Sequence, residues 1–131
     1  MGAFLSGRVY RDLGQAASFT EIDWVKKLFQ EKLGFLPYPG TFNLHVEGPA
    51  RQEWAEIKAR GPGIDIPPGD NGFCRSRCFR VRIEGKIEGA ILVPEVKGYP
   101  EEKIEILAPV HVKNTLNVED GDTLTIEVFE T

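Results

Sequence analysis

The stretch LGFLPYPGTFNLHV, residues 33–46, carries the strongest indication of the fold. Its second residue, Gly34, suits the end of a helix, and the two prolines and the glycine that follow favour a rigid turn. From Thr41 to Val46 apolar and polar residues alternate, which is typical of a strand with one apolar face. The stretch therefore predicts a helix, a tight turn and a half-buried strand in succession.

The residues before this stretch have the pattern of an amphipathic helix. Ile22, Val25 and Phe29 recur at helical spacing. Thr20, followed by Asp23, resembles the start of a capping box. We therefore expect a helix that Thr20 caps and that Gly34 ends.

The rest of the chain is dominated by short alternating segments. Strands are predicted over residues 4–10, 79–83, 87–93, 104–107 and 124–128. A second short helix is predicted over 52–60, and the glycine- and proline-rich residues 61–72 are expected to form a loop. These elements predict a mainly β fold with two short helices, in the form of a small closed or nearly closed β-barrel.

Length and charge restrict the function classes. The 131 residues are expected to form a single domain over residues 1–131, and 16 basic against 20 acidic residues give a net charge of −4. This balance argues against a surface that binds nucleic acid or an anionic membrane. No apolar run is long enough to span a membrane, and the first residues are too poor in apolar side chains for a secretion signal. We expect a cytoplasmic monomer in which Cys74 and Cys78 are reduced thiols.

Thr41 and Asn43 are the first candidate site residues. Side chains two apart on a strand share a face, so this hydroxyl and this carboxamide are expected to lie side by side after the turn. Such neutral oxygens can bind a hard cation, and magnesium takes few protein ligands beside substrate phosphates. The alternative from spacing alone is that both residues simply face solvent on a two-sided strand.

Several blocks of the sequence resemble the archaeal-type CTP-dependent riboflavin kinases. The longest is residues 33–44, and further matches follow in the same order: Pro94-Glu95 with Tyr99, Ile104-Glu105-Ile106-Leu107-Ala108-Pro109, and Leu116 with Asp120-Gly121-Asp122. Together these blocks extend the resemblance over most of the chain, from Gly7 to Val128.

The resemblance implies a six-stranded cradle-loop barrel that transfers the terminal phosphoryl group of CTP to riboflavin, giving FMN. It implies that Thr41 and Asn43 hold Mg²⁺ and that Glu105 contacts the flavin, where it would orient the attacking hydroxyl or accept its proton. Lys113 would offset phosphate charge. For Glu105 and Lys113 the alternative is a solvated surface charge. The implied nucleotide-binding residues are Asp12, Leu13, Gly14, Gln15, Ala16, Ala17, Val110, His111, Val112 and Lys113.

Two segments depart from the family pattern. Where the family has Gly-Leu-Gly-Glu-Gly near the nucleotide, residues 12–16 are Asp-Leu-Gly-Gln-Ala. The added methyl group of Ala16 and the charge of Asp12 disfavour close approach of phosphate. Lys97 replaces a threonine that contacts the flavin phosphate in the family, and lysine can bind that phosphate as a point charge. The alternatives are that Lys97 serves a different acceptor or lies in a solvent-facing loop.

These departures leave two other functions open. One is a non-catalytic barrel that binds a nucleotide or a flavin, and the other is a kinase with a different acceptor. Trp24 and Trp54 could stack on a flavin ring, although tryptophans at helical spacing are more often part of the core.

Overall fold

The structure is a computed structural model that describes residues 2–11, 19–68 and 74–129. It confirms a mainly β fold, in which the described residues form seven strands and three helices. In chain order the elements are β1 (Gly2–Tyr10), α2 (Asp23–Leu33), β2 (Phe42–His45), α3 (Gly48–Arg60), β3 (Ile64–Ile66), β4 (Ser76–Ile83), β5 (Ile87–Pro94), β6 (Lys103–Leu107), α4 (Val112–Leu116) and β7 (Thr123–Phe129).

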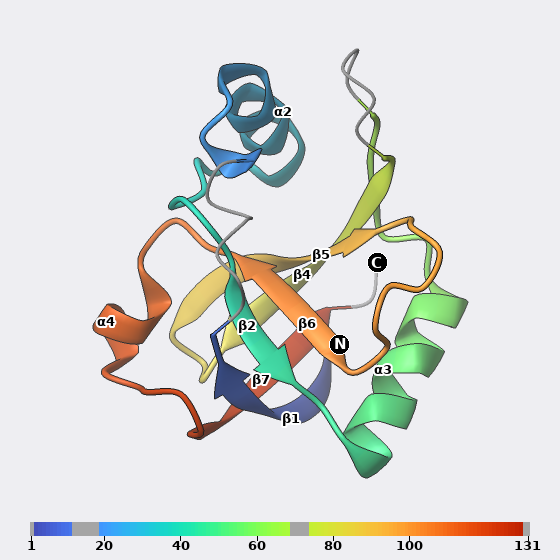
Figure 1. The fold of residues 1–131 in the computed structure, drawn as a ribbon, viewed down its shortest axis with the longest axis vertical. Coiled ribbons are helices and arrows are strands. Elements are labelled where there is room, and N and C mark those ends of the chain that lie inside the picture. Colours follow the sequence, from blue (N-terminus) through green and yellow to red (C-terminus); the bar gives the residue numbers. More distant parts are fainter. Residues whose placement is uncertain (1, 12–18, 69–73, 130–131) are drawn as a thin grey trace.

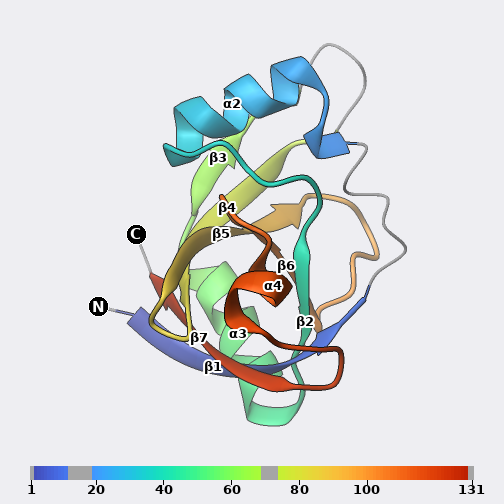
Figure 2. The same ribbon diagram turned by 90° about the vertical axis from the view of Figure 1, so that its left-hand side faces the viewer.

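All seven strands belong to one antiparallel sheet in the order β3-β4-β5-β6-β2-β1-β7. A further pairing joins β4 to β7, with Val81 opposite Val128 and Ile83 opposite Ile126. Six strands therefore form a closed circuit of pairings, and β3 extends the edge of β4 outside that circuit (Figures 1 and 2).

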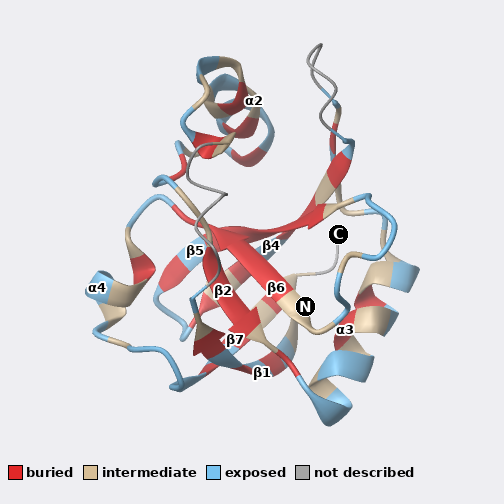
Figure 3. Cartoon of the chain, viewed as in Figure 1, coloured by how far each residue is buried: buried red, intermediate tan, exposed pale blue. Residues whose placement is uncertain are grey.

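The main hydrophobic core lies inside the curved sheet, and α3 supplies part of it. Leu44, Ile104 and Ile126 are fully buried there, as is expected for the apolar faces of alternating strands. Trp54 and Ile57 point from α3 into the same cluster. Figure 3 shows this buried centre where β2 and β6 cross the molecule. The burial of Trp54 removes it as a residue that could stack on a ligand.

A second cluster lies beneath α2 on the outer face of the sheet. Val25, Phe29 and Leu33 of α2 pack there against Cys78 and Leu92, among others. The predicted helix and its end are confirmed, since Gly34 follows α2 with a φ of 85°. Trp24 packs at the edge of this cluster, so its indole belongs to the helix packing.

The predicted cap of α2 is wrong. The N-cap residue is Ile22, which makes no side-chain cap hydrogen bond. Thr20 is buried, and its Oγ1 accepts a hydrogen bond from the Gly40 N–H at 2.8 Å. The hydroxyl therefore connects the segment before α2 to the turn before β2.

Two short elements and one extension were not predicted. The fold has three helices in its described part rather than two, because α4 forms over Val112–Leu116. It is a single turn containing two β-branched residues, too short to produce a periodic pattern. β3 forms within the predicted loop by pairing with β4. α3 begins four residues earlier than expected, at Gly48, with Pro49 in its first turn. None of the described helices is long and apolar enough to cross a membrane.

Candidate active site

A cavity of about 180 Å³ lies where the turn before β2, the end of β6 and the segment leading into α4 meet. It is smaller than the roughly 300–1,000 Å³ of typical small-molecule pockets, so the described walls enclose a space for part of a ligand. Its lining residues are Arg11, Tyr38, Pro39, Gly40, Thr41, Phe42, Asn43, Ile106, Ala108, Val110, His111, Val112 and Lys113. Six of the sequence-derived site residues are among them.

Thr41 and Asn43 lie side by side in this cavity, as their spacing predicts. The Thr41 hydroxyl donates a hydrogen bond to Asn43 Oδ1 at 2.8 Å. Asn43 is 6 % exposed, while Phe42 and Leu44, on the other face of the strand, are in the main core. The alternative that both are solvated residues on an open strand face is therefore wrong for Asn43.

The rigid turn before β2 is held by two hydrogen bonds and by the backbone conformation of one glycine. Gly40 has a φ of 92°, a conformation that favours glycine, and its N–H is bound by Thr20. The Tyr38 N–H donates to the Ala108 carbonyl at 2.7 Å, which connects the turn to the end of β6. This backbone geometry determines where Thr41 enters the cavity.

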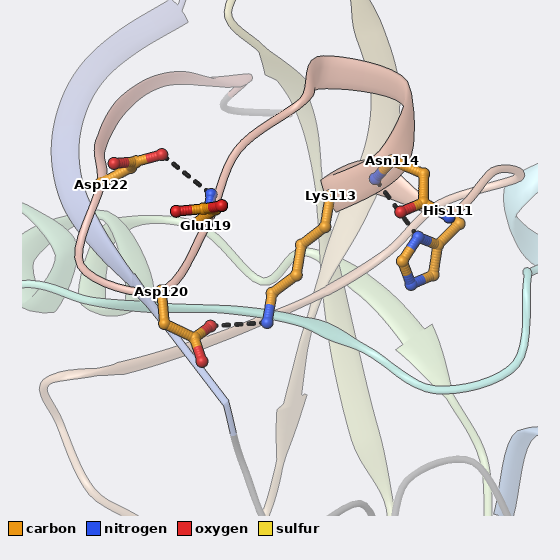
Figure 4. A network of polar contacts seen from close by, with 6 residues as sticks. All are labelled: His111, Lys113, Asn114, Glu119, Asp120 and Asp122. Carbon is orange, nitrogen blue, oxygen red and sulfur yellow. Dashed lines mark hydrogen bonds and ion pairs between the residues drawn. The ribbon is translucent and has the colours of Figure 1, made fainter.

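The expected nucleotide segment, residues 110–113, forms another part of the cavity wall, next to Tyr38. His111 is the N-cap of α4, and its Nδ1 accepts a hydrogen bond from the Asn114 N–H at 3.3 Å. Its ring packs edge-on against Tyr38, with the centroids 5.1 Å apart. Lys113 Nζ is 2.6 Å from Asp120 Oδ1, so this lysine is ion-paired rather than simply solvated (Figure 4).

Glu105 does not line the cavity but lies beside it. It is directly opposite Asn43 in the β2–β6 register, so the two side chains share one face of the sheet. Its side chain is buried, Tyr99 donates a hydrogen bond to Oε2 at 2.5 Å, and Lys103 Nζ is 3.5 Å from Oε1. The alternative of a solvated surface carboxylate is wrong for Glu105, because both of its oxygens have protein partners.

The remaining sequence-derived residues lie outside this constellation. Lys97 is exposed in the connection between β5 and β6 and does not line the cavity. The segment Asp12, Leu13, Gly14, Gln15, Ala16 and Ala17 lies outside the described residues.

The donor chemistry of the cavity fits a hard divalent cation that keeps most of its water. Thr41 Oγ1 and Asn43 Oδ1 are two adjacent neutral oxygens, the ligand type that magnesium accepts in small number. The residues described contain no group of three or more His, Cys, Asp or Glu side chains that could hold a metal ion.

Sequence reasoning did not name seven of the described lining residues as site residues, and Arg11 and Tyr38 are the two of these with polar side chains. Arg11 directly follows β1, and Tyr10 before it is opposite Asn43 in the β1–β2 register. Only the pairing of β1 with β2 brings Arg11 to the cavity, because the two segments are about 30 residues apart in the sequence. Tyr38 belongs to the turn quoted at the start, where it stands between two prolines. This rigid backbone was the sequence signal from which its place in the site could have been predicted.

The fold and the cavity thus define a small mainly β protein with a polar site for a small molecule. Comparison with known families identifies it further. Residues 9–128 match the family model of the CTP-dependent riboflavin kinase domain, described as domain of unknown function DUF120. The chain belongs to this family, which confirms the resemblance seen in its motifs.

The chain is similar, over nearly its whole length, to curated archaeal proteins named riboflavin kinase. Those of Pyrobaculum arsenaticum and Pyrobaculum aerophilum are 35% and 36% identical over 128 residues, covering 95% of this chain and 60% of each relative. That of Archaeoglobus fulgidus is 35% identical over 129 residues, covering 95% of this chain and 54% of the relative. The chain therefore spans a little over half the length of the curated relatives it matches.

Proposed function

We propose that the chain is a CTP-dependent kinase that phosphorylates riboflavin to FMN. Its family membership and its similarity to proteins named riboflavin kinase support this activity. The site supports it independently, because its cavity combines oxygen ligands with cationic side chains and lies beside a buried carboxylate.

The observation that carries the proposal is the register of β2 and β6. Asn43 lines the cavity and Glu105 lies opposite it, so their Cβ atoms are about 4.5–5.5 Å apart, as in other directly opposed antiparallel pairs. Phosphoryl transfer needs a phosphate and an acceptor hydroxyl aligned at short range more than it needs covalent chemistry. The register supports the proposal, because it brings Asn43, which we assign to the phosphate side, next to Glu105, which we assign to the acceptor side.

Each residue group has a separate role in this proposal. Thr41 and Asn43 hold Mg²⁺, which when bound neutralises part of the charge on the nucleotide phosphates. The segment from Val110 to Lys113 borders the nucleotide, and backbone groups near the exposed Val110 contact the pyrimidine.

The reaction proposed is an in-line displacement. The 5′-hydroxyl oxygen of riboflavin bonds to the γ-phosphorus of CTP while the bond from that phosphorus to the bridging oxygen breaks, and CDP leaves. Glu105 accepts a hydrogen bond from the hydroxyl and receives its proton as the new bond forms. Tyr99 and Lys103 hold the carboxylate in place for this step.

Lys97 and the segment 12–17 complete the proposed site. We place Lys97 near the FMN phosphate, because it is an exposed cation in the connection that precedes Tyr99 and Glu105. The segment from Asp12 to Ala17 follows Arg11, which already lines the cavity, and this continuity supports a place for it beside the nucleotide.

The finer features of the fold are proposals of the same kind. The closed circuit of six strands supports the six-stranded cradle-loop barrel expected of the family. We further propose that residues 1–131 form one domain that acts as a cytoplasmic monomer without binding nucleic acid or membrane, in keeping with the net charge of −4.

The test is to incubate the protein with riboflavin, Mg²⁺ and CTP, ATP, GTP or UTP in turn, and to separate FMN from riboflavin. FMN should form with CTP and should be lost on chelation. Asn43→Ala should lower turnover by at least about a hundredfold, since it removes a ligand used in positioning the phosphates. Gln52→Ala, which removes an exposed amide on α3, is the matched control.

The other outcomes distinguish the two alternatives left open by the sequence. Saturable binding of CTP without FMN formation would support the non-catalytic binding protein. Transfer of phosphate from CTP to another hydroxyl compound, but not to riboflavin, would support a kinase with a different acceptor. The departures at Asp12–Ala16 and Lys97 are what make both outcomes worth measuring.

A further inference from the structure

The described walls of the cavity are positively charged. They include Arg11 and Lys113 but no aspartate or glutamate. Such a lining favours an anionic ligand, and the two cations are the side chains able to bind its charge directly. The two residues differ in whether their side chains already have an anionic partner.

Lys113 already has an anionic partner. Its Nζ is 2.6 Å from Asp120 Oδ1, and Asp120 belongs to the turn before β7. The turn is itself ordered by Asp122, whose Oδ2 accepts a hydrogen bond from the Glu119 N–H at 2.8 Å (Figure 4). A phosphate that binds Lys113 must therefore compete with a carboxylate that the turn holds in place.

Arg11 is positioned by the same turn. The Val9 N–H donates to the Asp122 carbonyl at 2.8 Å, and the Gly121 N–H donates to the Val9 carbonyl at 2.7 Å. These bonds fix the end of β1 two residues before Arg11, and Tyr10 is opposite Asn43. Within the described part of the chain, Arg11 has no ion pair or hydrogen bond through its side chain, so its guanidinium is available to a ligand.

We propose that Arg11 is the cation that binds the phosphate groups of the ligand in this cavity, while Asp120 retains Lys113 at the wall. The identity of that ligand as CTP rests on the proposed function, but the role of Arg11 as a phosphate-binding residue does not. The planar guanidinium forms two parallel hydrogen bonds to a phosphate and remains charged at any working pH. Arg11 lines the same cavity as the proposed magnesium ligands, Thr41 and Asn43.

The experiment compares five forms of the full chain: wild type, Arg11→Gln, Arg11→Lys, Lys113→Gln and Arg8→Gln. Arg8 is the matched control, because it is an exposed arginine on the same strand that faces Glu47 rather than the cavity. Binding of CTP, of inorganic tripolyphosphate and of cytidine is measured by calorimetry, and FMN formation is measured in parallel. Thermal unfolding checks that each variant is folded.

Arg11→Gln should weaken binding of CTP and of tripolyphosphate by at least about tenfold, as expected for loss of hydrogen bonds to a charged group. Cytidine binding and the KM for riboflavin should not change. Lys113→Gln should have a smaller effect, and Arg8→Gln none. Arg11→Lys should restore part of the affinity because it restores the charge without the two parallel bonds.

The proposal is overturned if Arg11→Gln binds tripolyphosphate as the wild type does, or if Lys113→Gln has the larger effect. It is also overturned if the wild type does not bind tripolyphosphate. If the wild type binds tripolyphosphate through Arg11 but forms no FMN from CTP and riboflavin, the role of Arg11 stands and the proposed function fails.

Discussion

The Tyr99 hydroxyl donates a hydrogen bond to Glu105 Oε2 at 2.5 Å, across the connection that joins β5 to β6. The ammonium group of Lys103 is ion-paired with the other carboxylate oxygen, Oε1, and lies 5.7 Å from the centroid of the Tyr99 ring. The three side chains therefore form one cluster. Tyr99 and Lys103 together therefore hold the orientation of this carboxylate.

Tyr99→Phe removes this hydrogen bond and keeps the ring. Because a hydrogen bond to a charged group contributes about 1.5–3 kcal/mol, we expect the KM for riboflavin to rise about tenfold or more, with the KM for CTP unchanged. Steady-state kinetics with each substrate varied in turn provides the measurement. In a Glu105→Gln background the same change should have a smaller effect, and equal effects in both backgrounds would show that Tyr99 acts elsewhere.

Lys97→Ala should weaken binding of FMN several-fold and leave CTP binding unchanged, since an exposed lysine contributes mainly a point charge to a phosphate. Fluorescence titration with FMN and with riboflavin measures the effect, which should be confined to the phosphorylated flavin. Lys86→Ala, at the exposed turn between β4 and β5, is the control. An unchanged dissociation constant for FMN would refute the assignment of Lys97.

Trp54→Phe should reduce the free energy of unfolding by about 1–3 kcal/mol, less than truncation of a buried tryptophan to alanine. Trp54 is 1 % exposed and packs edge-on against Phe79, with the ring centroids 5.4 Å apart. Urea unfolding followed by circular dichroism gives the change in stability. The KM for riboflavin should stay the same, and a large increase in a variant that remains folded would mean that the indole contacts the flavin after all.

The two cysteines should react at very different rates with a thiol reagent. Burial raises the pKa of the Cys78 thiol to about 12, so at pH 8 only about one molecule in ten thousand carries its thiolate. Cys74 is exposed. A chromogenic disulfide reagent should modify one thiol quickly in the native protein and the second only after unfolding. Cys74→Ser should abolish the fast reaction, and a fast reaction that persists would contradict the burial of Cys78.

Sequence patterns predicted the parts of this molecule whose physics is local. The alternation in residues 41–46 gave the strand and the shared face of Thr41 and Asn43, because side chains two apart on a strand must point the same way. Gly34 ends α2 as expected, since its positive φ suits glycine. The family motifs supplied the roles proposed for these residues, and the family match confirms the resemblance.

What the sequence did not predict depends on contacts between distant segments. Thr20 was predicted to cap α2, but its hydroxyl accepts a hydrogen bond from Gly40, which follows α2 in the sequence. Arg11 reaches the cavity only through the pairing of β1 with β2, and the buried carboxylate of Glu105 is bound by Tyr99 and Lys103 from other positions in the chain. β3 and α4 are too short to show a periodic pattern in the sequence. β3 depends on its pairing with β4, and α4 depends on the cap that His111 provides.

The pairing of β4 with β7 has a consequence for behaviour at high concentration. Among the described strands, each except β3 has a partner on both edges over at least part of its length, which limits the strand edges to which another chain could add. The exposed edge of β3 is three residues long and carries the charged Asp65, which Arg75 binds through both carboxylate oxygens. Short, charged edges resist edge-to-edge association, and the molecule should therefore stay dispersed in solution rather than polymerise through its strands.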